Sequence, residues 1–209
     1  MSETYFWDFD GTLYNTYPVM VAAFVHAMQE QHIKVKKDEV YHHMRQTSLG
    51  RTFKWALTNH PELDEPTARA AYKEYEEQRH DEMHPFPGVA EVCAQVVDHG
   101  GRNFLLTHRD EQAVAILERD GLKKLFSGFV TSKLSFPRKP DPASLNYLCN
   151  EYAVDKEHAT MIGDRALDVE AGHNAGMKGI LFDPDNIINE DGNPDKRIKS
   201  MWELVDKKA

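Results

Sequence analysis

The chain has little positive charge, few cysteines and no long apolar segment. Its 209 residues include 25 Lys and Arg against 34 Asp and Glu, which gives a net charge of −9, and no basic block offsets this balance. Such a balance argues against non-specific binding to nucleic acids or to anionic membranes. It does not exclude a small anionic ligand, because one binding site needs only a few local cations.

The two cysteines, Cys93 and Cys149, both lie in apolar helical patterns. We therefore expect buried thiols rather than a disulfide or a metal-binding pair. No apolar run approaches the length that spans a bilayer, and the N-terminus leads straight into a predicted strand instead of a signal peptide. These absences predict a soluble, cytoplasmic protein whose thiols stay reduced.

Short apolar runs alternate with helical patterns along most of the chain. Apolar residues at helical spacing, closed by glycines, separate the runs, and Asp141-Pro142 is the predicted N-cap and first residue of one helix. This alternation predicts an α/β fold with a doubly wound parallel sheet. The runs predict strands over residues 5–9, 103–106, 129–130, 160–162 and 179–182.

One stretch breaks the alternation, because residues 16–84 contain helical patterns, including 19–29 and 67–79, and no convincing strand. An insert after the first strand is placed above the end of the sheet at which open α/β folds bind ligands. We therefore predict an α/β core domain over residues 1–15 and 85–209 and a helical cap domain over residues 16–84. An ordinary structural layer of helices is the alternative.

Charged and hydroxyl side chains follow several of the predicted strands. Asp8 and Asp10 point to the same side of the crevice, since side chains alternate along a strand. Carboxylates that converge there repel one another unless a divalent cation lies among them, and Mg²⁺ prefers oxygen ligands. An acid pair, a hydroxyl, an ammonium group and a metal together suit a phosphoryl group. The residues are Asp8 and Asp10 in "YFWDFDGTL", Thr107 in "FLLTHRD", Lys139 in "PRKPDP", and Asp164 and Asp168 in "MIGDRALD".

In their order and spacing, "DFDGTL", "LLTHR", "KPDP" and "GDRALDVEAGHNAG" resemble the four motifs of the haloacid dehalogenase superfamily. The resemblance covers the whole chain: residues 16–84 resemble the family's helical cap of the first type, and "PFPGV" resembles the return from that cap. Among family members, the chain is most similar to phosphoglycolate phosphatases and related enzymes. The resemblance implies a Mg²⁺-dependent phosphatase that acts on a small phosphorylated metabolite through an aspartyl-phosphate.

The resemblance also implies a role for each motif residue. Asp8 is expected to attack phosphorus, and Asp10 to protonate the leaving alcohol and then to activate water. Thr107 and Lys139 are expected to bind the phosphate oxygens. Gly11 lets the backbone turn close to the phosphate, where neighbouring N–H groups can help.

The same resemblance implies the metal-binding residues, which are Asp8, Asp10 through its carbonyl oxygen, Asp164 and Asp168. Asp168 is expected either to touch the metal directly or to orient Lys139 or a metal-bound water. A first-turn or capping role on the following helix is the alternative for Asp168.

Substrate choice is expected to depend on the cap. The segment "TSLGRTFKW", residues 47–55, is the predicted lid loop, with a bend at Gly50 and with Arg51 and Lys54 placed to meet an anionic substrate. A solvated helix start is the alternative for this segment. His108 either faces the phosphate or is an exposed loop histidine. A monomer is the default expectation, and a dimer stays open.

The same residues bear on other functions known on this fold. A sugar-phosphate mutase of the β-phosphoglucomutase kind is expected to carry a hinge histidine where this chain has Met20. Halide-removing relatives lack the second acid of the first motif, whereas Asp10 is present here. A non-catalytic binding or regulatory module is the alternative of a different class, although every catalytic position is filled.

Overall fold

The computed structural model describes residues 3–205 of the chain, which divides into two compact units. The larger unit joins Met1–Tyr14 to Pro85–Ala209, and the smaller unit is the insert Asn15–His84. The larger unit is therefore assembled from two separate pieces of the sequence, and every motif residue at a strand end belongs to it.

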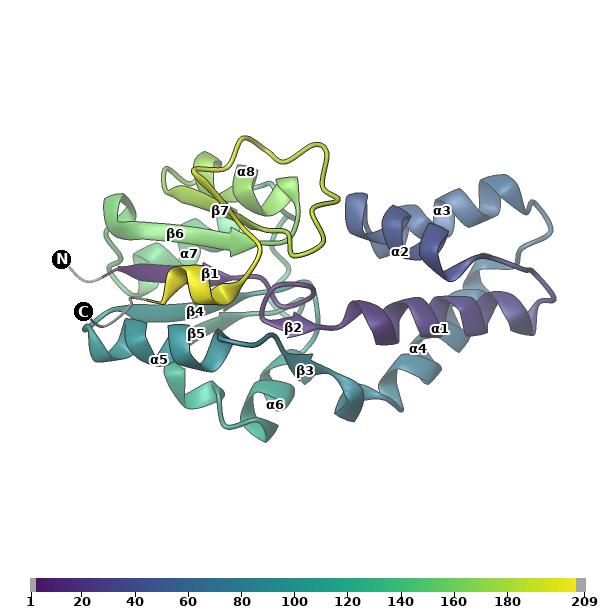
Figure 1. Ribbon diagram of the computed structural model, residues 1–209, viewed down its shortest axis with the longest axis horizontal. Coiled ribbons are helices and arrows are strands. Elements are labelled where there is room, and N and C mark those ends of the chain that lie inside the picture. Colours follow the sequence, from purple (N-terminus) through teal and green to yellow (C-terminus); the bar gives the residue numbers. More distant parts are fainter. Residues whose placement is uncertain (1–2, 206–209) are drawn as a thin grey trace. The chain divides into compact units, whose positions relative to one another are not determined.

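A six-stranded parallel sheet forms the centre of the larger unit, with the strand order β5-β4-β1-β6-β7-β8 (Figure 1). All four residues of β1 are buried, because β4 and β6 flank this strand and helices cover the sheet. The strands are β1 (Thr4–Trp7), β4 (Arg102–Leu106), β5 (Phe126–Val130), β6 (Ala159–Gly163), β7 (Lys178–Phe182) and β8 (Lys196–Ile198).

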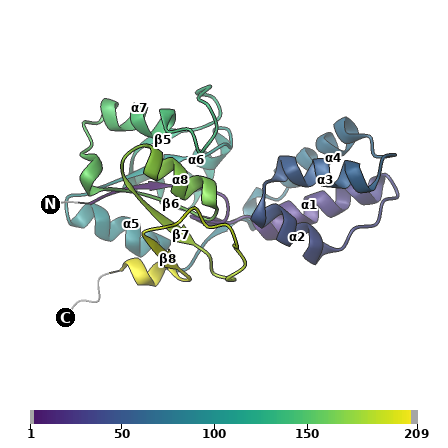
Figure 2. The ribbon, with the colours of Figure 1, turned by 90° about the horizontal axis from the view of Figure 1, so that it is seen from above.

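Helices pack on both faces of this sheet (Figure 2). On one face, side chains of α7 and α8 share an apolar cluster with Phe6 and Phe104, whose rings stack 5.0 Å apart. The neighbouring side chain Asn103 points to the other face, where its Nδ2 donates a hydrogen bond to the Cys93 carbonyl of α5 at 2.9 Å. The predicted doubly wound α/β fold is confirmed. The helices are α5 (Val89–Asp98), α6 (Gln112–Arg119), α7 (Ala143–Glu151) and α8 (Ala166–Asn174).

The smaller unit consists mainly of helices with an apolar core of their own (Figure 1). In that core the Phe24 ring of α1 lies 4.8 Å from the Phe53 ring of α3. The helical patterns predicted over residues 19–29 and 67–79 correspond to α1 and α4. The helices are α1 (Tyr17–Glu30), α2 (Lys37–Gln46), α3 (Leu49–Asn59) and α4 (Glu65–Glu77).

The predicted lid loop over residues 47–55 is mostly the first half of α3. Ser48 caps this helix, because its Oγ accepts a hydrogen bond from the Arg51 N–H at 3.2 Å. Gly50 lies inside the helix rather than at a bend. The loop prediction is therefore wrong, and the alternative of a helix start is correct.

The predicted start of α7 is also displaced, because the helix begins at Ala143 and Pro142 is its N-cap residue. Asp141 precedes the cap, but its Oδ1 accepts a hydrogen bond from the Ala143 N–H at 2.9 Å. The side chain thus satisfies one of the free amides that every helix start exposes.

Three short strands were not predicted. β2 (Tyr14–Asn15) and β3 (His84–Pro85) pair with each other where the chain passes between the two units, and β8 adds an edge strand beside β7. Strands of two or three residues are too short to form an apolar pattern, and Lys196 and Arg197 of β8 are exposed. The sequence therefore offers no signal for them.

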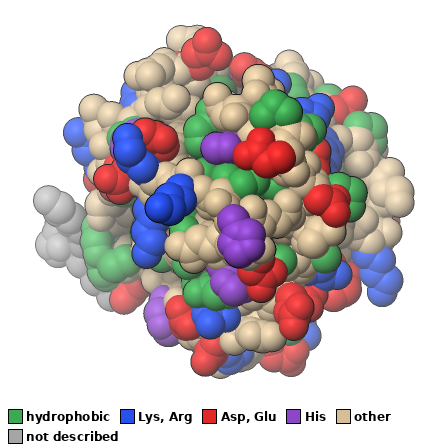
Figure 3. All heavy atoms as spheres, turned by 90° about the vertical axis from the view of Figure 1, so that its right-hand side faces the viewer, with side chains coloured by type: hydrophobic (Ala, Val, Ile, Leu, Met, Phe, Trp, Pro, Cys, Tyr) green, Lys and Arg blue, Asp and Glu red, His purple; other side chains and the backbone are tan. Residues whose placement is uncertain are grey.

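No helix within residues 3–205 is long and apolar enough to cross a bilayer. Figure 3 shows one face of the molecule, on which acidic, basic and histidine side chains are interspersed. That face carries no broad basic patch of the kind that attracts nucleic acid.

Candidate active site

Three neighbouring strands of the large sheet end in motif residues. Asp8 follows β1, Thr107 follows β4 and Asp164 follows β6, so the order β4-β1-β6 places the three ends side by side. The Asp8 N–H donates to the Ile162 carbonyl at 2.9 Å, and the Thr107 N–H donates to the Val130 carbonyl at 2.9 Å. These backbone hydrogen bonds extend the sheet and fix the points from which the side chains project.

Lys139 lies between two carboxylates in the buried centre of the site. Its Nζ donates to Asp8 Oδ1 at 2.5 Å, pairs with Asp168 Oδ1 at 2.5 Å, and donates to the Leu106 carbonyl at 3.4 Å. The side chains of Lys139 and Asp168 have no exposed surface, and that of Asp8 is 4% exposed. Charges buried this deeply need such partners, because their desolvation is costly.

The charges in this centre shift one another's pKa values. Burial raises the pKa of Asp8; the Lys139 ammonium opposes this shift, while Asp168 and Asp164 add to it. Burial by itself lowers the pKa of Lys139, but the Asp168 and Asp8 carboxylates outweigh burial and raise it. Lys139 therefore stays protonated at neutral pH and supplies a fixed positive charge.

Three carboxylates of the site are placed to hold a metal ion. Oxygens of Asp8, Asp164 and Asp168 lie within 4.8 Å of one another, and all three residues are buried. The buried Oδ2 atom of Asp8 has no hydrogen-bond partner among residues 3–205. Mg²⁺ takes oxygen ligands and keeps several waters, so this donor set fits a divalent metal ion.

The Asp10 carboxylate pairs with Arg109, for which the sequence predicts no role. Arg109 Nε donates to Asp10 Oδ1 at 2.7 Å, and the two side chains are 11% and 22% exposed respectively. The Asp10 carboxylate is not one of the three that cluster at the candidate metal position. The one available signal was a basic residue two positions after Thr107.

A tight turn follows Asp10. Gly11 has a φ of 72°, in the left-handed region that glycine adopts without strain. The Gly11 N–H donates to the Tyr14 carbonyl at 2.8 Å, and the Tyr14 hydroxyl donates to Asp120 Oδ2 at 2.8 Å, next to the end of α6. The Gly11 N–H is already hydrogen-bonded inside the turn. The amides expected to contact the phosphate near Gly11 are therefore those of its neighbours.

Asp168 combines two roles between which the sequence left the choice open. Its Oδ2 accepts a hydrogen bond from the Arg165 N–H at 3.2 Å at the start of α8, while its Oδ1 pairs with Lys139. Gly163 makes this arrangement feasible, because a Cβ atom there would lie 2.1 Å from the Asp168 Cβ. The start of α8 therefore packs directly against the end of β6.

His108 is half-buried and neutral. Burial lowers its pKa to about 4, with Lys139, Arg138 and Arg165 adding to the shift and Asp168 opposing it. The side chain is therefore not the freely exposed loop residue of the alternative interpretation. Lys139, Arg138 and Arg165 thus all place positive charge near this ring.

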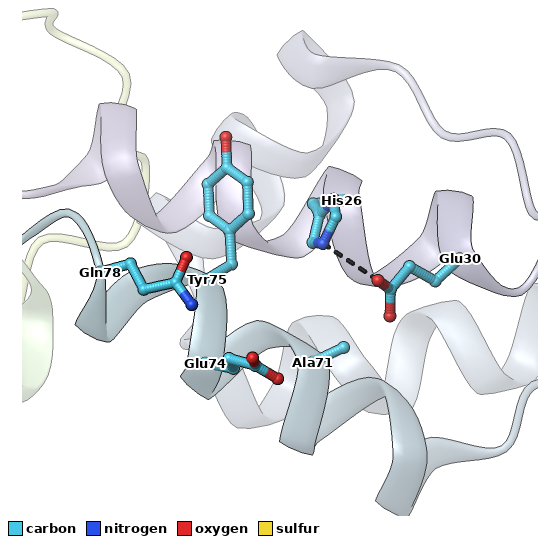
Figure 4. Close-up of a pocket in the computed structure, with 6 residues that line it drawn as sticks. All are labelled: His26, Glu30, Ala71, Glu74, Tyr75 and Gln78. Atoms are coloured by element: carbon cyan, nitrogen blue, oxygen red, sulfur yellow. Dashed lines mark ion pairs between the residues drawn. The ribbon is translucent and has the colours of Figure 1, made fainter.

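The predicted substrate residue Arg51 lies in the helical unit, where its side chain is exposed in the first turn of α3. The same unit contains a polar cavity of about 110 Å³ between α1 and α4 (Figure 4). Two carboxylates and neither lysine nor arginine line this cavity, so it does not suit an anion. Its lining residues are His26, Glu30, Ala71, Glu74, Tyr75 and Gln78.

The motif geometry is matched by the comparison with known families. A sequence model described as haloacid dehalogenase-like hydrolase matches residues 5–182, a range that includes all four motifs and the inserted helical unit. The chain belongs to this family. Its position in the haloacid dehalogenase-like family explains why the four motifs occur in this order on neighbouring strand ends.

Similar members of the haloacid dehalogenase-like family include two kinds of phosphatase. Phosphoglycolate phosphatase from Vibrio cholerae is 29% identical over 81% of this chain and 79% of its own length. Pyrophosphatase PpaX from Halalkalibacterium halodurans is 28% identical over 98% of this chain and 95% of its own length. A hydrolase structure from Streptococcus pneumoniae is 34% identical, covers 87% of this chain and 94% of its own, and has a TM-score of 0.66. The predicted similarity to phosphoglycolate-phosphatase-like members is confirmed.

Proposed function

We propose that this haloacid dehalogenase-like hydrolase is a Mg²⁺-dependent phosphatase that hydrolyses a small phosphate monoester through an aspartyl-phosphate on Asp8. The observation that carries the proposal is the state of the Asp8 carboxylate: Lys139 holds one oxygen, while the buried second oxygen has no partner among the described residues. The phosphatase names of the similar relatives support the same reaction class.

In the first half of the reaction, a carboxylate oxygen of Asp8 attacks phosphorus, and the bond from phosphorus to the leaving oxygen breaks. Asp10 gives its proton to that oxygen, so a neutral alcohol leaves. Lys139 balances the charge of the transferred phosphoryl oxygens, and the Thr107 hydroxyl donates a hydrogen bond to them. Neutral His108 adds a ring N–H near Lys139.

In the second half, a water molecule attacks the phosphorus of the aspartyl-phosphate. The ionised Asp10 takes the proton from this water as the new bond forms, and the bond from phosphorus to Asp8 breaks. Inorganic phosphate leaves, Asp8 is again a carboxylate, and Asp10 is again protonated.

Of the three clustered carboxylates, Asp8 and Asp164 would hold the metal ion, together with the carbonyl oxygen of Asp10. Mg²⁺ held there would supply positive charge to the phosphoryl oxygens and would reduce the repulsion between the buried carboxylates. Asp168 supports the position by holding Lys139 in place.

The first test is hydrolysis of p-nitrophenyl phosphate and of a panel of phosphorylated metabolites that includes phosphoglycolate and pyrophosphate. We expect turnover with Mg²⁺ and its loss in excess EDTA. Ca²⁺ should replace Mg²⁺ poorly, because its larger and looser coordination shell disturbs the in-line geometry. Full turnover in EDTA contradicts the metal assignment, and no turnover on any substrate contradicts the enzyme assignment.

The second test separates the two acids of the first motif. Asp8→Asn should reduce activity to background, because a neutral amide cannot form the aspartyl-phosphate. Asp10→Asn should still be phosphorylated by p-nitrophenyl phosphate, whose leaving group hardly needs a proton, but its dephosphorylation should slow by roughly 10²–10⁴. Rapid-quench mass spectrometry should find phosphate on Asp8 in the Asp10 variant. Label on another side chain would show that the nucleophile is assigned wrongly.

A further inference from the structure

The contact between Asp10 and Arg109 joins two motifs that are 99 residues apart in the sequence. It is a hydrogen-bonded ion pair, in which Arg109 Nε donates to Asp10 Oδ1 at 2.7 Å. Both side chains are largely withdrawn from solvent, at 11% and 22% exposed. Hydrogen bonds between charged groups in such surroundings are stronger and more directional than exposed ones.

Arg109 is itself held by its own loop. Its backbone N–H donates to Thr107 Oγ1 at 3.1 Å, and its carbonyl accepts a hydrogen bond from the Ser132 N–H at 2.8 Å. Its guanidinium carbon lies 5.7 Å from the centre of the ring of Phe9, the residue that precedes Asp10 in the chain. The loop after β4 thus presents the guanidinium to Asp10 from a fixed backbone.

Asp10 itself lies beyond the end of β1, where the regular strand pairing has stopped. An aspartate has two freely rotating side-chain torsions, so an unheld carboxylate would sample several orientations. A proton carrier works only when one oxygen is within hydrogen-bond reach of the reacting oxygen, and a displacement of about 1 Å costs on the order of 10²-fold in rate.

We propose that Arg109 is a positioning residue that fixes the Asp10 carboxylate through Oδ1 and leaves Oδ2 to carry the proton. In the first step Oδ2 gives its proton to the leaving oxygen as the bond from phosphorus breaks. In the second step Oδ2 takes a proton from the attacking water. The inference rests on the proposed function, because it acts through the role assigned to Asp10 there.

The test is a double-mutant cycle with Arg109→Gln and Asp10→Asn, measured on p-nitrophenyl phosphate. Arg109→Gln alone should lower kcat by about 10- to 100-fold and change KM by less than about twofold, since the nucleophile and the phosphate ligands stay in place. It should also give a burst of p-nitrophenolate and accumulate phosphate on Asp8, because the water is poorly activated. In the Asp10→Asn background, Arg109→Gln should cost less than about twofold.

Two further variants separate positioning from folding. Arg109→Lys keeps the charge and should recover part of kcat, and added guanidinium ion should partly restore Arg109→Ala. Arg69→Gln, which removes an ion pair with Glu65 on α4 of the helical unit, is the matched control and should retain wild-type kcat. Failure of both rescues, with kcat lost in proportion to lost folded protein by circular dichroism, overturns the proposal in favour of a structural role.

The remaining outcomes distinguish this inference from the proposed function. In one outcome, the fold-loss in kcat of the double variant equals the product of the losses of the two single variants. In another, Arg109→Gln raises KM at constant kcat. Either outcome shows that Arg109 binds the substrate directly and overturns only the positioning role. Full activity of Asp10→Asn overturns the proton-carrier assignment and this inference together. If Arg109→Gln keeps the wild-type kcat while Asp10→Asn loses activity, this inference alone is overturned.

Discussion

His108 illustrates how a single residue reports on the charge of its surroundings. Its ordinary pKa is 6.5, and burial together with nearby lysine and arginine side chains lowers the value to about 4 in the folded protein. The neutral imidazole is therefore favoured by folding. Between these two values the unfolded chain binds a proton at this position that the folded chain does not bind.

This difference predicts a pH-dependent stability. The contribution of His108 to the free energy of unfolding is complete above about pH 6.5, decreases as the pH falls through the window, and levels off below about pH 4. In urea titrations, wild type should lose about 1 kcal/mol more than His108→Gln between about pH 7.5 and pH 5, after allowance for the partial exposure of the ring. His42→Gln, at an exposed position on α2, is the control. Equal losses in wild type and His108→Gln contradict the prediction.

At the scale of single residues, the sequence predicts which side chains meet at strand ends better than it predicts ion pairs between loops. The convergence of Asp8, Asp164 and Asp168 follows from the rule that parallel strands end at one edge, so the motif order was sufficient to predict it. The ion pair between Asp10 and Arg109 could not be predicted, because a single basic residue in a loop belongs to no periodic pattern from which its partner could be inferred. The catalytic roles themselves stay predictions.

At the scale of an element, the contact between β6 and α8 depends on the absence of one side chain. Gly163 ends the strand, and the first turn of α8 brings Asp168 against it. A Cβ atom on Gly163 would lie 2.1 Å from the Asp168 Cβ, far below any van der Waals contact, and the obstacle is close to the backbone. The turn between them therefore tolerates glycine alone.

Gly163→Ala should consequently lower the free energy of unfolding by about 1–3 kcal/mol, because the clash is relieved only by moving α8. The movement should also separate Asp168 from Lys139 and reduce kcat. Gly50→Ala is the control, since the nearest atom to its Cβ would be Ser48 Oγ at 4.0 Å and alanine favours the helix. Urea titration and steady-state kinetics test both variants. Wild-type stability of Gly163→Ala would show that the turn relaxes freely.

The predicted elements differ from the observed ones for local physical reasons. Short apolar runs and helical periods predicted the main strands and most helices correctly, because burial dictates those patterns. Gly50 predicts a bend, yet the Ser48 cap and the helix formers that follow outweigh one glycine in the first turn. β8 has one buried residue, Ile198, and so carries too little apolar pattern to be recognised.

At the scale of the whole molecule, chemistry and substrate choice are expected to reside in different units. The acids, Lys139 and Thr107 belong to the larger unit, whereas Arg51 belongs to the helical insert. A residue that only selects the substrate should affect large and small phosphate esters differently, because a small ester makes no use of it.

Arg51→Ala should therefore raise KM by about 5- to 10-fold for the best metabolite found in the panel, the cost of one charge-assisted hydrogen bond. Hydrolysis of p-nitrophenyl phosphate should be almost unchanged. Lys73→Ala, at an exposed position on α4, serves as the matched control. Equal losses on both substrates would show that Arg51 supports folding rather than selection.

The strand at the centre of the sheet is also the first one to leave the ribosome. β1 can pair with β4 and β6 only after the helical insert, which has a core of its own, has been synthesised between β1 and β4. We expect the insert to fold first during translation and the sheet to close late, because its contacts are distant in sequence. A nascent chain that stalls before residue 159 thus exposes the unpaired apolar strand Thr4–Trp7, which is prone to aggregate until β6 arrives.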